Sequence, residues 1–199
     1  MKKGIVILFV LLLAGCVTSP PKHQDNICHI FDEKDDWYDD AKDAQKRWGS
    51  PIYITMAIMH QESRFQAKAK PPRTRFLWIF PGPRPSSSYG YSQAKDETWD
   101  WYKRSGGKWG ADRDEFGDAI DFIAWYNHTS HKRNGIKPTD AYHLYLAYHE
   151  GHGGFKRRTF NKKGWLKGVA KKVSARSARY KKQLAGCQER LESGGWWFF

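Results

Sequence analysis

The spacing of the apolar side chains constrains the fold of this chain more than any other feature. Ile52, Met56 and Met59 recur on one face of a helix, as do Phe116 and Ile120 further along the sequence. Such spacing is typical of amphipathic helices, whereas a half-buried strand would show strict alternation. We find no convincing strand pattern and no internal repeat. The sequence therefore predicts an all-α fold.

Glycine, proline and charge patterns set the expected helix boundaries. Acidic residues early and basic residues late indicate a first helix with Gly49 as its C-cap. Ser50 and Pro51 then restart the chain as N-cap and first helical residue. Five prolines interrupt residues 66–89, which we interpret as a loop. The expected helices cover residues 35–48, 51–64, 94–103, 114–126 and 139–149, with a weaker helical stripe in residues 156–182.

The first residues have the organisation of an export signal. Lys2 and Lys3 precede an apolar run that is shorter than the ~20 residues a membrane-spanning helix needs. The run ends in Leu-Ala-Gly-Cys, which resembles a bacterial lipobox and predicts lipidation of Cys16. An ordinary signal peptide with a chance cysteine is the alternative. In lipoproteins like those of enteric bacteria an aspartate at the next position retains the protein at the inner membrane, so Val17 favours an outer-membrane lipoprotein facing the periplasm.

Two cysteines, Cys28 and Cys187, remain after Cys16 is assigned to the lipid. An exported protein folds in an oxidising compartment, where a leftover pair of cysteines favours a disulfide. We therefore predict that a Cys28–Cys187 disulfide ties the N-terminal tether to the basic C-terminal segment. Two free thiols are the alternative, because spacing alone does not exclude them.

Charge and aromatic content narrow the class of ligand. The formal net charge is +13, and +11 remains once Lys2 and Lys3 leave with the signal. A basic chain often binds nucleic acid, but an exported protein meets little of it, so we expect anionic envelope polymers or lipid headgroups instead. Aromatic residues make up 16% of the chain. Because their faces stack on sugars and bases, they favour an extended polymer as the ligand.

The chain length suits one domain with a targeting segment. Between Lys156 and Lys182 the sequence has twelve Lys or Arg and no acid, which leaves open a polyanion-binding surface and a solvated helix face. The expected segments are a lipoprotein signal peptide (1–15), a tether (16–34), a helical domain (35–155) and a basic helical C-terminal extension (156–199).

Glu62 is the strongest candidate for chemistry. It stands near the C-terminal end of a helix rich in Ile and Met. A carboxyl group held against apolar side chains resists ionisation, so its pKa rises. A general acid needs such a raised pKa to donate a proton near neutral pH. Position alone does not distinguish this acid from a solvent-facing glutamate at a helix end.

Three short motifs strengthen the interpretation. Residues 61–65 read Gln-Glu-Ser-Arg-Phe, residues 88–93 read Ser-Tyr-Gly-Tyr-Ser-Gln, and residues 146–151 read Leu-Ala-Tyr-His-Glu-Gly. In that order they resemble the Glu-Ser, Gly-Leu-Met-Gln and Ala-Tyr-Asn-x-Gly motifs of the soluble lytic transglycosylase family, which shares the goose-type lysozyme fold. The resemblance covers about residues 50–155. It implies a lysozyme-like domain that cleaves peptidoglycan glycan strands without a cofactor.

The resemblance also implies a role for each matching residue. Glu62 corresponds to the catalytic acid/base, Ser63 to the serine that supports it, and Tyr148 to the tyrosine that orients the carboxyl. Gly90 and Gln93 correspond to the residues that line the cleft, where a glycine lets a sugar approach the backbone and a glutamine meets N-acetyl groups.

This chain departs from the family pattern at three positions. Tyr91 and Ser92 take the place of the Leu-Met of the second motif, and His149 takes the place of the asparagine of the third, with Glu150 after it. We expect Tyr91 and His149 to contribute to substrate binding, with a subsite preference of their own. His149 and His152 are three residues apart, not four as in a zinc-protease helix, so we expect no metal site.

The distribution of acids bears on whether water or the substrate attacks. A glycosidase normally uses two carboxylates. No Asp or Glu occurs from Ser63 to Gln93, where goose-type lysozymes carry candidate second acids. The absence favours an intramolecular route, in which the muramoyl 6-hydroxyl closes a 1,6-anhydro ring. Asp96, Asp100 and Glu150 remain open as the second carboxylate of a lysozyme-like hydrolase, and a non-catalytic glycan-binding lipoprotein is the alternative from another class.

The loop from Lys68 to Pro85 joins the first two motifs and combines basic side chains with Phe76, Trp78 and Phe80. Aromatic and basic residues together suit sugar stacking or anchoring at a membrane interface. We expect this loop to flank the cleft and to contact glycan or membrane, and a loop folded onto the core is the alternative. The sequence identifies no protein partner.

Overall fold

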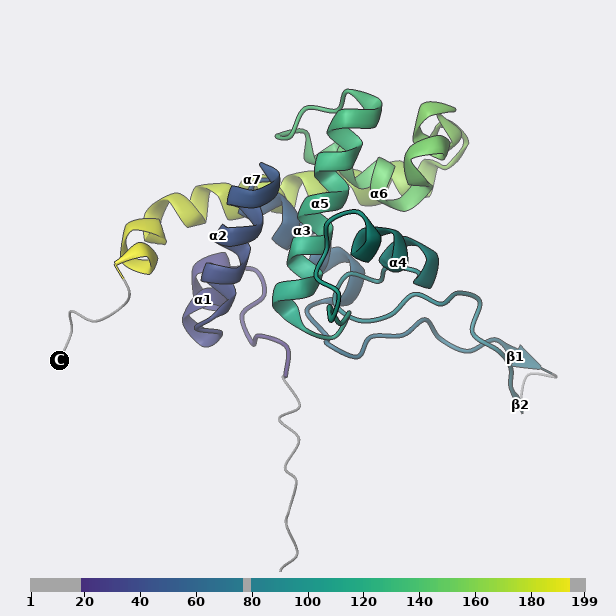
Figure 1. Cartoon of the computed structure of the whole chain (residues 1–199), viewed down its shortest axis with the longest axis horizontal. Coiled ribbons are helices and arrows are strands. Elements are labelled where there is room, and N and C mark those ends of the chain that lie inside the picture. Colours follow the sequence, from purple (N-terminus) through teal and green to yellow (C-terminus); the bar gives the residue numbers. More distant parts are fainter. Residues whose placement is uncertain (1–18, 77–79, 194–199) are drawn as a thin grey trace, which may run out of the picture.

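The computed structural model describes residues 19–76 and 80–193 of the chain (Figure 1). The predicted signal peptide and Cys16 therefore lie outside the described residues. The all-α prediction is confirmed, because helices dominate the described part and its two strands are two residues each. The elements are α1 (Ile27–Glu33), α2 (Trp37–Trp48), α3 (Ile52–Ser63), β1 (Arg75–Phe76), β2 (Phe80–Pro81), α4 (Asp96–Arg104), α5 (Phe116–Asn134), α6 (Ala141–Lys156), a 3-10 turn (Thr159–Lys162) and α7 (Gly164–Glu192).

Helix α3 forms the centre of the core. Eight of its twelve residues are buried, and it packs against α2, α5 and α7. A helix that is apolar on most sides is stable only when other elements surround it. The helix ends at Arg64, which has a left-handed backbone with φ of 51°, and the chain turns inward to the buried Phe65. This ending places Glu62 where the core meets the surface.

The predicted boundaries agree with the structure where caps define them. Helix α2 ends at Gly49, which has the expected left-handed backbone with φ of 70°. Helix α3 begins one residue later than predicted, because Pro51 is extended and serves as the N-cap. Helix α5 continues to Asn134, well past the predicted end. Its last turns bury Asn127 and Ser130, polar residues that an apolar pattern does not reveal.

The N-terminal segment differs from the prediction of a tether over residues 16–34. Residues 27–33 form α1, whose buried Ile27, Ile30 and Phe31 share one helical face and join the core beside α7. The predicted disulfide is present, with the Cα atoms of Cys28 and Cys187 6.1 Å apart. A helix this short is marginal alone, so tertiary packing and the disulfide hold it.

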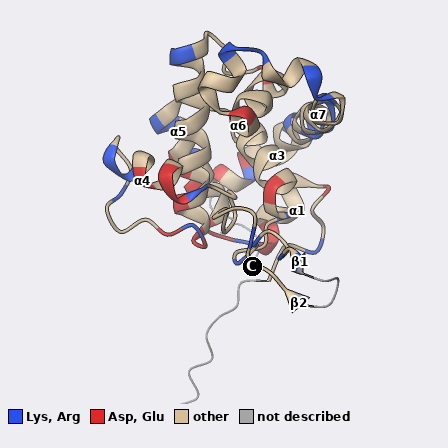
Figure 2. Cartoon of the chain, turned by 90° about the vertical axis from the view of Figure 1, so that its right-hand side faces the viewer, with Lys and Arg blue, Asp and Glu red and all other residues tan. Residues whose placement is uncertain are grey.

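The basic C-terminal segment packs as part of the same body. Helix α7 lies against α1, α3 and α6, and its buried side includes Leu166, Val173 and Leu184. Most Lys and Arg residues of α7 are exposed, and Figure 2 colours them blue. Among the described residues, no helix combines the length and the apolar character needed to cross a membrane.

The loop between α3 and α4 forms a hairpin that projects away from the helices (Figure 1). Strands β1 and β2 pair antiparallel, with Arg75 opposite Pro81. The base of the hairpin returns to the body, where the carbonyl of Ala69 accepts a hydrogen bond from the Gly90 amide at 3.0 Å. The paired strands therefore lie away from the core, while their base adjoins the second motif.

Candidate active site

A cleft of about 460 Å³ opens beside the C-terminal end of α3. It brings together residues of all three motifs, which lie far apart in the sequence. The wall is formed by Glu62, Pro71, Ser88, Gln93, Ala94, Lys95, Thr98, Phe122, Tyr126, Tyr148, His149, Glu150 and Gly151. The central side chains come from α3, α5 and α6, so the packing of these helices shapes the cleft.

Glu62 has the perturbed pKa that its position predicts. Its side chain is partly buried at the end of α3. Burial raises the pKa of its carboxyl from 4.5 to about 7, and a hydrogen bond with Tyr145 opposes the rise. Near neutral pH the group therefore populates both protonation states, so it can donate a proton and take one back.

Two tyrosines of α6 approach Glu62, and the structure corrects their expected roles. The Tyr145 hydroxyl forms the hydrogen bond with the carboxyl, and burial together with Glu62 keeps the pKa of Tyr145 well above its ordinary value. The Tyr148 hydroxyl instead donates to the carbonyl of Ser92 at 2.6 Å. A hydroxyl has one proton, so Tyr148 does not donate to Glu62 at the same time. The tyrosine bonded to the carboxyl is thus Tyr145, whereas Tyr148 ties α6 to the second motif.

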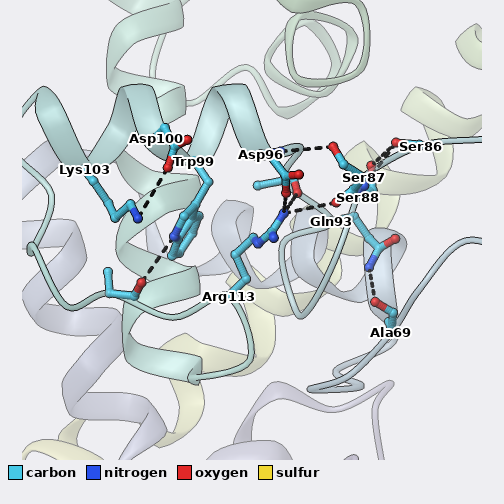
Figure 3. A network of polar contacts seen from close by, with 12 residues as sticks. Ala69, Ser86, Ser87, Ser88, Gln93, Asp96, Trp99, Asp100, Lys103 and Arg113 are labelled. Atoms are coloured by element: carbon cyan, nitrogen blue, oxygen red, sulfur yellow. Dashed lines mark hydrogen bonds and ion pairs between the residues drawn. The ribbon is translucent and has the colours of Figure 1, made fainter.

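Gln93 is fixed at the wall of the cleft. Its backbone φ is 51°, and its side-chain Nε2 donates to the carbonyls of Ala69 at 3.0 Å and Gly90 at 2.9 Å. The bond to Ala69 is drawn in Figure 3. Because both neighbours are acceptors, they set which end of the amide faces them. The side-chain Oε1 is then the atom with which Gln93 can accept a hydrogen bond from a ligand.

Gly90 was expected to let a sugar approach the backbone. In the structure it lets the backbone of Arg113 approach instead. It is buried, its φ is 75°, and a Cβ atom at this position would lie 2.0 Å from the carbonyl oxygen of Arg113. The same carbonyl accepts a hydrogen bond from the Tyr91 amide at 3.0 Å. The close approach that requires a glycine is therefore made by another segment of this chain.

Tyr91 and Ser63 also lie away from the expected contacts. Tyr91 is 1% exposed, and its ring packs edge-on against Trp37 and Phe116. Burial of so large an apolar surface stabilises the core, so the expectation that Tyr91 binds substrate is corrected. The Ser63 hydroxyl donates to the carbonyl of Met59 at 3.3 Å, one turn back along α3. Ser63 thus closes the helix end and makes no hydrogen bond to Glu62.

His149 and Glu150 line the same cleft as Glu62 and Gln93. Glu150 has a side chain that is 3% exposed, and its carboxylate accepts hydrogen bonds from Lys163 at 2.7 Å, Thr159, and His149 at 3.1 Å. Burial alone would raise the pKa of Glu150, but these three contacts outweigh it and lower the pKa to about 2. Glu150 is therefore ionised throughout the physiological pH range.

The two other candidate acids, Asp96 and Asp100, are not among the residues that line the cleft. Asp96 pairs with Arg113 at 2.8 Å, and Asp100 pairs with Lys103 at 3.4 Å (Figure 3). More than half of each carboxyl side chain is exposed. The cleft wall as described thus carries two carboxyl groups, those of Glu62 and Glu150.

Several wall residues lie outside the three motifs. Phe122 and Tyr126 come from α5 and stand one turn apart, and the Tyr126 ring lies 5.1 Å from that of Tyr148. Tyr145 precedes Tyr148 by three residues, so helical spacing places both on one face of α6. That spacing could have identified Tyr145, but no local signal identifies the α5 residues. Within the described ranges, no group of three or more His, Cys, Asp or Glu is placed to hold a metal ion.

One of three comparisons with known proteins identifies a family for this chain. No curated protein and no solved structure matches the chain. A family model described as the transglycosylase SLT domain matches residues 4–187, which is most of the sequence and includes α1 and most of α7. The chain therefore belongs to the transglycosylase SLT family, which has a lysozyme-like all-α fold and acts on peptidoglycan.

Proposed function

We propose that this protein is a lytic transglycosylase that cleaves the β-1,4 bond between MurNAc and GlcNAc and leaves 1,6-anhydro-MurNAc ends. Glu62 is the single catalytic acid/base. Family membership supports a peptidoglycan-acting lyase. The bond, the product and the residue roles are parts of the proposal.

The observation that carries the proposal is the pKa of Glu62, which burial raises to about 7 at the end of α3. An acid/base acts best when its pKa lies near the working pH, because both protonation states are then accessible. In the first step Glu62 protonates the glycosidic oxygen, and the substrate's N-acetyl group stabilises the developing positive charge. In the second step Glu62 takes the proton of the muramoyl 6-hydroxyl, whose oxygen closes the anhydro ring.

The state of Glu150 supports the intramolecular route over hydrolysis. A lysozyme-like hydrolase needs a second carboxylate as base or nucleophile. Glu150 has a pKa of about 2, which makes it a weak base, and Lys163, Thr159 and His149 occupy its oxygens. Asp96 and Asp100 are paired with Arg113 and Lys103 and do not line the cleft. A ring closure that returns the proton to Glu62 needs no second carboxylate.

The rest of the wall suits an N-acetylated sugar. Gln93 offers Oε1 to an amide N–H, since its Nε2 already donates to Ala69 and Gly90. Phe122 and Tyr126 supply apolar and aromatic surface beside Glu62. Tyr145 holds the carboxyl in a fixed orientation by its hydrogen bond. These contacts position a sugar ring against the acid, which is the part of catalysis that geometry provides.

The cellular setting is proposed from the sequence. The lipobox-like ending at Cys16 supports a lipid anchor, and Val17 favours the outer membrane with the domain facing the periplasm. The Cys28–Cys187 disulfide suits an oxidising compartment outside the cytoplasm.

Mass spectrometry of the products from purified peptidoglycan tests the reaction directly. An anhydro ring is lighter by one water than a reducing end. We expect anhydro ends from the wild-type protein and no cleavage by Glu62→Gln. Products with reducing ends alone would identify a hydrolase, and cleavage by Glu62→Gln at the wild-type rate would overturn the site.

A further inference from the structure

The first turn of α7 exposes a tryptophan beside the cleft. Trp165 is 60% exposed, although most tryptophans of the described chain are buried or half-buried. Its ring meets the ring of His149 edge-on, with centroids 5.2 Å apart. His149 lines the cleft, so Trp165 continues the wall beyond the residues that surround Glu62.

The chain just before Trp165 is tied to α6 through the carboxylate of Glu150. Lys163, two residues before Trp165, bonds to Glu150 at 2.7 Å, and Thr159 bonds to the other carboxylate oxygen. His149 completes the set at 3.1 Å. One buried carboxylate thus connects α6, the 3-10 turn and the start of α7. His149 is thus bonded to this carboxylate, and the Trp165 ring lies edge-on against His149.

An exposed tryptophan held in one place is suited to stacking on a flat ring. The indole offers a large apolar face, and fixing it costs little conformational entropy. The protein does not gain the burial energy of this ring in its core. Trp109 offers the contrast, because it is 96% exposed in the α4–α5 connection and does not line the cleft.

We infer that Trp165 and His149 form a sugar-binding subsite that extends the cleft, with an N-acetylated hexose of the glycan strand as its ligand. The inference rests on the proposed function for the identity of the polymer. Trp165 stacks on the apolar face of the sugar, His149 borders the same ring, and Glu150 is the positioning residue behind both. The subsite binds a sugar away from the bond that breaks, so long oligosaccharides gain from it and short ones do not.

Binding to N-acetylglucosamine oligomers tests the inference without turnover. In a Glu62→Gln background, affinities for the hexamer and the dimer are measured for Trp165→Ala, for the conservative Trp165→Phe and for the control Trp109→Ala. We expect Trp165→Ala to weaken hexamer binding about tenfold, as truncation of an anchoring aromatic typically does. Trp165→Phe should recover most of the affinity, and dimer binding and Trp109→Ala should remain at the level of the background protein.

Each outcome bears on the subsite separately from the reaction. Equal hexamer affinities for Trp165→Ala and Trp109→Ala would overturn the subsite, whatever the products of the active enzyme. A loss with the dimer as large as that with the hexamer would also overturn it, because Trp165 would then act on the central cleft. If the wild-type products lack anhydro ends but the hexamer loss is found, the proposed reaction fails and the subsite stands. With Glu62 intact, Trp165→Ala should raise KM for glycan strands and leave kcat near its original value.

Discussion

Glu62 and Glu150 are two carboxyl groups in one cleft, and their surroundings shift their pKa values in opposite directions. Glu62 is partly buried at a helix end where one tyrosine hydroxyl partly offsets the loss of water, and its pKa rises to about 7. Glu150 is also buried, but an ammonium, a hydroxyl and an imidazole contact it, and its pKa falls to about 2. Burial is common to both, so the difference lies in whether charged and polar partners compensate for it.

The comparison distinguishes a carboxyl group suited to proton transfer from one that holds the structure together. A carboxyl that is poorly compensated keeps its proton near neutral pH, which suits an acid/base. A carboxyl that is well compensated stays ionised, and its charge holds neighbouring elements together. From the residue type alone, either could have been the catalytic group.

Glu62→Gln should produce the largest effect. The amide keeps the shape of the side chain but cannot donate and then accept a proton, so the rate should fall by at least ~10²- to 10⁴-fold. Cleavage of purified glycan strands measures this loss. Glu97→Gln is the matched control, because Glu97 is an exposed residue of α4 outside the cleft wall. A comparable loss of rate in both variants would contradict the proposal that Glu62 is the catalytic acid/base.

Glu150→Gln should act on stability more than on the proton transfer. The variant removes the charge that pairs with Lys163, which is itself partly exposed to water, so the free energy of unfolding at pH 7 should fall by about 1 kcal/mol. The folded pKa of Glu150 lies below its ordinary value of 4.5, so the stabilisation is complete above pH 4.5. It is lost as the pH falls toward 2. Urea unfolding at several pH values should show the difference from wild type shrinking across that window, and a constant difference would contradict the assignment.

Tyr145→Phe should move the pH dependence of the reaction. The Tyr145 hydroxyl lowers the pKa of Glu62, so its removal should shift the alkaline limb of the pH–rate profile upward. A less well oriented carboxyl should also reduce the rate, by about tenfold. Tyr148→Phe is the matched comparison, since its hydroxyl is bonded to Ser92. We expect Tyr148→Phe to leave the alkaline limb in place, and the reverse pattern would reassign the orienting role to Tyr148.

The smallest expected effect is that of Glu62 on stability. The folded pKa of Glu62 lies above its ordinary value, so the wild-type fold is progressively destabilised as the pH rises from 4.5 through about 7. Glu62→Gln does not ionise, so it should be the more stable protein at pH 8.5, by on the order of 1 kcal/mol. At pH 4 the advantage should disappear. Thermal unfolding at the two pH values would detect the change, and an advantage that is larger at pH 4 would reverse the sign of the comparison.

Local patterns were sufficient to predict the all-α fold and the raised pKa of Glu62. The apolar faces, Gly49 and the Glu-Ser helix end each depend on a few neighbouring residues, and Glu62 follows from them. The leftover cysteine pair likewise predicted the disulfide. These features are encoded within a turn or two of helix, or in the counting of one residue type.

Contacts between distant segments could not be predicted in the same way. Gly90 matches a motif glycine, but the carbonyl that requires it belongs to Arg113. Tyr91 stands beside Gln93 in sequence and yet packs on Trp37 and Phe116. The low pKa of Glu150 depends on a hydrogen bond with Lys163, which immediately precedes α7. In each case the partner is chosen by tertiary packing, and the local sequence carries no record of it.

The chain joins the fold soon after Cys16, the residue proposed to carry a lipid. Residues that follow Ser19 already pack on the helical domain, because Pro21 is buried and Arg176 contacts Asp25 at 2.7 Å. If Cys16 carries the proposed lipid, only a few residues, at most about 3.6 Å each, separate the membrane from the α1–α7 surface. This short linker would then restrict the enzyme to glycan strands close to the bilayer. Inserting a long Gly-Ser spacer before Ser19 should widen the layer of peptidoglycan that the enzyme cuts. An unchanged layer would show that linker length does not limit the reach of the enzyme.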